Sequence, residues 1–231
     1  MNNNFAQNQL TRKELSRGIR YLLFQTVFLP GLLSYGNRLL PAPLPAAWVN
    51  FLFFTINLGA ALGILHRFLK GFFPVPPKQL LRILLVGILF FGINQGASRA
   101  LGWLLSRVST DFSNVNDQTI FGLLRENFLL VAIGTVIFVP IAEECFFRGV
   151  LFRGLYQRAP WAAWVFSVFI FAFVHVKNYW GVVSPLTLAL CFVQYLPAGI
   201  CLAAAYRVSG SLLCPILIHA AVNAAGLLTL R

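Results

Sequence analysis

The sequence predicts an all-α fold, a polytopic membrane helix bundle of about seven to eight transmembrane helices that enclose a polar cavity. Composition is the first reason, because 58% of the 231 residues are hydrophobic and only 10% are charged, whereas about a quarter of a soluble domain is charged. Segment length is the second reason. Apolar runs of about 20 residues, long enough to cross a bilayer as helices, follow one another along the chain.

The first three spans are predicted at residues 19–39, 46–68 and 80–105. Proline-rich turns separate them, LPAPLP at 40–45 and FFPVPPK at 72–78, because proline cannot continue a helix. Pro30 and Gly31 should kink or break the first span.

Four more spans are predicted at residues 124–147, 160–176, 184–206 and 210–230. Before them, the polar stretch 106–119 contains Asp111 and Asp117, and we expect it to form a surface loop or a short interfacial segment. No internal repeat separates the spans into units. We therefore expect 1–18 to be a polar cytoplasmic N-terminus and 19–231 a single membrane domain, with its chemically active core at about 120–230.

The basic residues predict the orientation of the bundle. The net charge is +12, and the Lys and Arg residues fall mostly in the short connections between apolar runs, where they orient helices and meet anionic lipid head groups. If the N-terminus is cytoplasmic, that side receives twelve of the 18 basic residues. We expect a multi-pass protein of the bacterial inner (plasma) membrane with a cytoplasmic N-terminus, in contact with membrane lipids and not with nucleic acid.

Ionisable residues inside apolar spans are costly and usually have a function and a partner. They occur here in three places: Glu143 and Glu144 with Arg148 in IAEECFFRG, His175 in FAFVH, and His219 with Asn223 in HAAVN. Residues four apart share a helix face, and adjacent residues point about 100° apart. We therefore expect Glu144 to pair with Arg148, Glu143 to be left for chemistry, and His219 and Asn223 to lie on one stripe.

These residues suit hydrolysis by water, because no Ser or Cys has a neighbour that would activate it. Glu143, helped by His175, would take a proton from the water, and His219 with Asn223 would stabilise the oxyanion. Two alternatives remain. Glu143, His175 and His219 could instead bind zinc with one open position, or the histidines could be structural hydrogen-bonding residues. The cofactor is therefore either none or zinc.

The same residues carry a family resemblance. EECFFR at 143–148 fits an EExxxR motif, FAFVH at 171–175 fits FxxxH, and HAAVN at 219–223 fits HxxxN, in order and on separate spans. The last 110 or so residues thus resemble the CPBP family of intramembrane proteases, the CAAX protease and bacteriocin-processing family, also called Abi. Residues 1–120 match it only in hydropathy.

The resemblance implies an intramembrane endopeptidase, CAAX-type or leader-processing, with Glu143 and His175 as the water-activating pair and His219 and Asn223 as the oxyanion hole. Glu144, Arg148 and Phe171 would support them. Its partner would be a peptide or membrane-protein substrate, which is prenylated in eukaryotic members. Family members are commonly called metalloproteases, although the Glu, His and Asn set fits a metal-free mechanism better.

Two other functions compete with this one. A non-catalytic membrane scaffold or regulator would keep the protease fold, although such a protein is expected to lose some of the four catalytic residues, and none is lost here. A transporter with a proton relay through Glu143 and the histidines is expected to show symmetric repeats, and the sequence has none.

Overall fold

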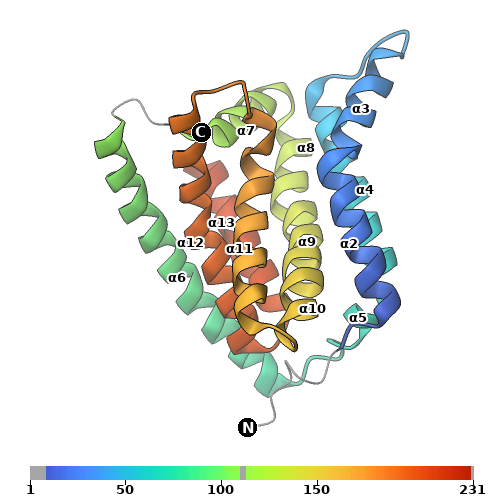
Figure 1. Ribbon diagram of the computed structural model, residues 1–231, viewed down its shortest axis with the longest axis vertical. Helices are drawn as coiled ribbons and strands as arrows, with labels where there is room; N and C mark the ends of the chain where they lie inside the picture. Colours follow the sequence, from blue (N-terminus) through green and yellow to red (C-terminus); the bar gives the residue numbers. More distant parts are fainter. Residues whose placement is uncertain (1–8, 110–112, 230–231) are drawn as a thin grey trace.

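The structure, a computed structural model, describes residues 9–109 and 113–229. In these residues the chain is helical and contains no strand, and its long helices stand side by side in a bundle (Figure 1). This confirms the predicted class, an all-α polytopic bundle. Asp111 and the first eight residues of the predicted N-terminal segment lie outside the described residues.

Residues 9–109 of the described chain form five helices in order: α2 (Arg12–Val27), α3 (Leu29–Arg38), α4 (Ala46–Ile64), α5 (His66–Lys70) and α6 (Pro77–Val108). The first predicted span is divided between α2 and α3. The break falls at Phe28, directly before Leu29 and Pro30, and Pro30 occupies the first turn of α3. A proline there costs no hydrogen bond, because the first helical N–H groups have no partner within the helix.

The second half begins with α7 (Val115–Glu126), an amphipathic helix that shares only residues 115–119 with the stretch 106–119 expected to be a loop or interfacial segment. One continuous apolar rod follows, made of α8 (Phe128–Ile133), η1 (Gly134–Phe138), α9 (Val139–Glu144), η2 (Cys145–Phe152) and α10 (Arg153–Tyr156). The last elements are α11 (Pro160–Val176), η3 (Lys177–Tyr179), α12 (Pro185–Ser209) and α13 (Leu213–Thr229).

Five helical segments in the described residues are long and apolar enough to cross a membrane: Ala46–Ile64, Pro77–Val108, Phe128–Tyr156, Pro160–Tyr179 and Pro185–Ser209. Leu213–Thr229 is a shorter apolar helix. Each predicted span therefore corresponds to helical structure, but the boundaries differ. The fourth, predicted at 124–147, begins at Phe128 and runs to Tyr156, because the apolar pattern continues through GVLFRGLY.

The most deeply buried part of the bundle surrounds η2, whose eight residues are all buried. Phe147 packs edge-on against Phe171 of α11, with ring centroids 5.4 Å apart. On α12, Gly199 lets its helix approach α11, because a Cβ at this position would lie 3.1 Å from Val168 Cγ1. The packing of α11 and α12 around η2 fixes the helix that carries the acidic pair.

Helix α7 is tied to the start of α4 by one carboxylate. Glu126, at the end of α7, accepts hydrogen bonds from the backbone N–H groups of Ala46 and Ala47. These groups lie in the first turn of α4 and have no partner within that helix. The link holds α7 across one end of the bundle (Figure 1), where Asn116 and Thr119 of α7 line the cavity of the candidate active site.

Candidate active site

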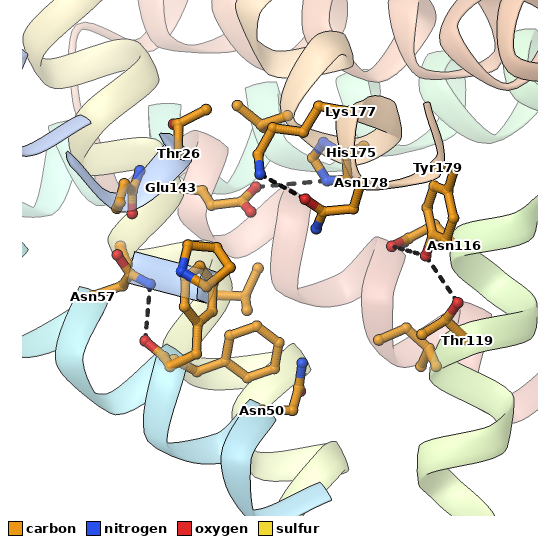
Figure 2. Close-up of a pocket in the computed structure, with 18 of the residues that line it drawn as sticks. Thr26, Asn50, Asn57, Asn116, Thr119, Glu143, His175, Lys177, Asn178 and Tyr179 are labelled. Carbon is orange, nitrogen blue, oxygen red and sulfur yellow. Dashed lines mark hydrogen bonds and ion pairs between the residues drawn. The ribbon is translucent and has the colours of Figure 1, made fainter. Parts of the chain in front are cut away.

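Glu143 and Glu144 end the short helix α9, which stands between two π-helical segments, η1 and η2. Such segments widen a helix locally and are frequent at functional sites. Glu143 faces a cavity of about 210 Å³ that also includes His175 of α11. Figure 2 shows both side chains pointing into this space. The other polar lining residues come from α2, α4, α7 and η3: Gln25, Thr26, Asn50, Asn57, Asn116, Thr119, Lys177, Asn178 and Tyr179.

Glu143 and His175 face each other across a gap. His175 Nε2 lies 3.8 Å from Glu143 Oε2, which is too far for a direct hydrogen bond. His175 Nδ1 lies 2.7 Å from the carbonyl oxygen of Phe171, and a carbonyl only accepts, so Nδ1 carries the proton and neutral His175 presents Nε2 as an acceptor. Glu143 Oε2 is buried and has no hydrogen-bond partner among the described residues. Glu143 Oε2 and His175 Nε2 are thus two hydrogen-bond acceptors that face the same part of the cavity.

The imidazole of His175 is held by aromatic rings on both sides. Tyr195 of α12 stacks on it with ring centroids 4.3 Å apart, and Phe171 lies at 4.6 Å. The Tyr195 hydroxyl lies 3.4 Å from Asn114 Oδ1, and Asn114 donates to Gln194 at 2.8 Å. Sequence reasoning missed Tyr195, although Gln194 and Tyr195 are adjacent polar groups within an apolar helix, the signal that singled out the other site residues.

Glu144 forms the predicted pair with Arg148. Arg148 Nε lies 3.1 Å from Glu144 Oε2, and Nη1 donates to Oε1 at 3.2 Å, with both side chains fully buried. Arg148 also donates from Nη2 to the carbonyl of Gly199 at 3.2 Å, and its guanidinium lies 4.5 Å from the ring centroid of Phe171. The charge of this arginine is therefore compensated within the bundle.

His219 contacts the second glutamate of the acidic pair and not the cavity that Glu143 faces. Its Nδ1 lies 2.8 Å from Glu144 Oε1, so Glu144 joins Arg148 and His219. Asn223 donates from Nδ2 to the carbonyl of Thr135 at 2.8 Å. Thr135 belongs to η1, where the π-helical turn leaves its carbonyl able to accept from another helix. Neither His219 nor Asn223 lines the cavity of Glu143.

The three residues expected as zinc ligands do not converge. His175 directs Nε2 toward Glu143, whereas His219 directs Nδ1 toward Glu144. In the described part of the chain, no group of three or more His, Cys, Asp and Glu side chains is arranged to hold a metal ion. The donor set of Glu143, His175 and His219 therefore does not fit the predicted zinc site.

One wall of the cavity is a hydrogen-bonded cluster between α7 and η3. The Tyr179 hydroxyl lies 2.8 Å from Thr119 Oγ1 and 3.5 Å from Asn116 Oδ1. The structure places Tyr179 in the cavity wall (Figure 2). Beside it, Lys177 donates to Asn178 Oδ1 at 2.7 Å. Lys177 is the single Lys or Arg among the described residues that line the cavity.

Comparison with known proteins supports the family resemblance. Residues 125–225 match the family model described as "Type II CAAX prenyl endopeptidase Rce1-like". Neither the comparison with curated proteins nor that with solved structures gives a match. The matched segment contains the acidic pair, Arg148, both site histidines and Asn223. Residues 125–225 of this chain are therefore similar to the Rce1-like type II CAAX prenyl endopeptidases, in agreement with the resemblance to the CPBP family.

Proposed function

We propose that the protein is an intramembrane endopeptidase in which Glu143 and His175 activate a water molecule. One observation carries this proposal. Glu143 Oε2 and His175 Nε2 are two acceptors 3.8 Å apart in a polar cavity inside an apolar bundle. A water can donate one hydrogen to each at ordinary hydrogen-bond lengths, and its oxygen lone pairs then point toward a bound substrate. The family match supports the same reaction class.

The reaction needs a general base that takes a proton from the water and later gives it to the leaving amine. As the water oxygen bonds to the peptide carbonyl carbon, Glu143 takes a water proton and the carbonyl electrons move onto oxygen. When the tetrahedral intermediate collapses, the C–N bond breaks and Glu143 returns the proton to the leaving amine. His175 orients the water through Nε2, while its Nδ1–H remains on the Phe171 carbonyl. No step passes through a metal.

His219 and Asn223 complete the proposed catalytic set as oxyanion donors. The amide nitrogen of Asn223 has two hydrogens, and the bond to Thr135 occupies one. His219 Nδ1 is committed to Glu144, so donation from Nε2 requires the protonated imidazole. Both donors must approach the cavity when substrate binds, as catalytic hydrogen bonds often tighten only in the substrate complex.

The substrate would be a peptide or membrane protein cut within the bilayer. The similarity to a family of CAAX prenyl endopeptidases supports CAAX-type processing of a prenylated chain, and leader-peptide processing is the alternative. We also propose that the N-terminus is cytoplasmic, because twelve basic residues lie on that side of the predicted spans.

A scaffold function is the second candidate, and one observation favours it. Asn223 and His219 are engaged with Thr135 and Glu144, outside the cavity that holds Glu143. A scaffold would keep these contacts permanently, because they join α13 to α9 and η1.

One experiment distinguishes the two. The purified full-length protein in detergent would be incubated with a farnesylated CAAX peptide, the same peptide without farnesyl, and leader-type peptides, and the products identified by mass spectrometry. Glu143→Ala is the test variant. Gln25→Ala is the matched control, since Gln25 lines the same cavity without an ionisable group.

We expect the wild type and Gln25→Ala to cleave at least one peptide, Glu143→Ala to cleave none, and a chelator to leave the rate unchanged. Cleavage by Glu143→Ala at the wild-type rate would remove Glu143 from the mechanism. Activity that a chelator abolishes and zinc restores would put a metal into the reaction. A scaffold cleaves nothing, and its effect in cells survives Glu143→Ala.

A further inference from the structure

A second polar cavity lies away from the candidate active site, between the start of α2 and the end of α10. It encloses about 100 Å³, and both elements are found at the lower end of the bundle in Figure 1. The lining residues are Gln9, Leu10, Arg12, Leu15, Arg153, Gly154, Gln157 and Arg158. They include three guanidinium groups and two carboxamides but no carboxylate, so an anion is the ligand that this lining fits.

Two glycines allow the helices that form the walls of this cavity to pack closely against each other. A Cβ on Gly154 would lie 2.6 Å from Leu15 Cδ1, and a Cβ on Gly18 would lie 2.5 Å from Val150 Cγ2. Helix α2 therefore packs directly on η2 and α10, closer than any side chain at these glycines would permit. Arg12 on one wall and Arg153 on the other are placed by this packing.

The acidic residue nearest in sequence is already engaged. Glu14 is 5% exposed. Its Oε2 accepts from the backbone and hydroxyl of Thr11 at 2.9 and 2.7 Å, and its Oε1 accepts from the backbone of Phe68 at 2.9 Å. Both carboxylate oxygens thus have donors, and Glu14 is absent from the cavity lining. Its contacts hold it toward α5.

Three arginines at this end of the bundle line the cavity. Arg153 is 4% exposed, so its guanidinium is fixed in place, while Arg12 and Arg158 are exposed and can move onto a ligand. Nearby, Arg207 donates from Nε to the Tyr156 hydroxyl at 2.9 Å. Arginine suits a phosphate group, as it suits a carboxylate, because its planar fork donates two parallel hydrogen bonds to a pair of anionic oxygens.

We propose that this cavity binds a phosphate group, supplied by the head group of an anionic phospholipid. The lipid source follows from position. The cavity opens where apolar helices end, at the level of lipid head groups, and basic pockets between transmembrane helices are suited to such groups. A bound phosphate would join α2 to α10, the C-terminal end of the rod that carries Glu143 and Glu144.

Lipid binding to the full-length protein, measured by native mass spectrometry in detergent, tests the proposal. Phosphatidylglycerol would be compared with phosphatidylcholine and with inorganic phosphate. The test variant is Arg12→Gln with Arg158→Gln, because both side chains are exposed and we expect the fold to tolerate their loss. The matched control is Lys13→Gln with Arg17→Gln, which removes the same charge from exposed positions outside the cavity.

We expect the wild type and the control to bind one phosphatidylglycerol in preference to phosphatidylcholine, and the test variant to bind it at least about tenfold more weakly. The wild type could instead bind inorganic phosphate saturably, lose this binding in the test variant, and show no preference for phosphatidylglycerol. That result would support the phosphate site and overturn the lipid as its source. Equal weakening in the control variant, or no binding of either phosphate compound, would overturn the site itself.

Discussion

Glu144 and His219, 75 residues apart in the sequence, lie 2.8 Å apart in the structure. The contact joins the last helix to the helix of the acidic pair, and it occupies the carboxylate that also neutralises Arg148. Glu144 is therefore a structural centre of the bundle, while Glu143, one residue earlier, faces the cavity. The predictions below depend on this division.

Glu144→Ala should destabilise the protein by about 3–5 kcal/mol, because it leaves the fully buried Arg148 without its counter-ion. Glu143→Ala should change the stability by less than about 1 kcal/mol, since Glu143 makes no direct hydrogen bond through its buried oxygen. Thermal unfolding of both variants in detergent measures the difference. Equal losses in the two variants would show that the carboxylates share one structural role.

Tyr195→Ala should lower kcat by about ten- to hundredfold with less effect on KM. Without the ring stacked at 4.3 Å, His175 can rotate away from the water, and small misplacements of catalytic groups are costly. Tyr195→Phe is the control, because it keeps the ring and removes only the hydroxyl. If the two variants lose activity equally, the hydroxyl and not the stacking is what matters. Steady-state kinetics on whichever peptide the wild type cleaves provides the measurement.

Gly18→Ala should cost about 1–3 kcal/mol by overpacking. The new methyl would meet Val150 at 2.5 Å, and a β-branched side chain has little freedom to move. Gly59→Ala in α4 has nothing within 4 Å of the new atom and should instead be stabilising by about 0.4–1 kcal/mol. A chemical unfolding series on the two variants checks the signs, and a stable Gly18→Ala protein would refute the close approach of α2 and η2.

Acid should weaken the attachment of α2 to α5. Burial by itself raises the pKa of Glu14, but hydrogen bonds from Thr11 and Phe68 outweigh it, and the pKa lies below its ordinary value. A carboxyl group with a lowered folded-state pKa contributes stability above its unfolded pKa of about 4.3, and loses it as pH falls through the folded value.

The wild type should therefore exceed Glu14→Gln in Tm near pH 7, and this margin should shrink below about pH 4. Melting curves of both proteins between about pH 3 and pH 7 provide the measurement. A margin that is constant across this range would mean that Glu14 does not titrate with a lowered pKa.

Hydropathy and helix periodicity predicted much of this architecture. The apolar runs marked the helical segments, Pro30 marked the break between α2 and α3, and the four-residue spacing of Glu144 and Arg148 predicted their ion pair. These features depend on neighbours along one helix, so the local sequence is enough to reveal them.

Contacts between helices were harder to predict, because they depend on how each helix is rotated about its axis. The partner of His219 could have been either glutamate, since these differ by about 100° on one helix. The π-helical segments η1 and η2 change that rotation again, and no residue pattern predicted them. The roles of His219 and Asn223 as oxyanion donors remain predictions.

The most direct test of the central claim is the cleavage rate of Glu143→Gln, which keeps the size of the side chain and removes its basicity. An equal Tm of the variant and the wild type would show that the variant is folded. We then predict a cleavage rate at least about a hundredfold lower, as expected for the loss of a general base. A folded Glu143→Gln protein that cleaves within about tenfold of the wild-type rate would contradict the assignment of Glu143 as the base.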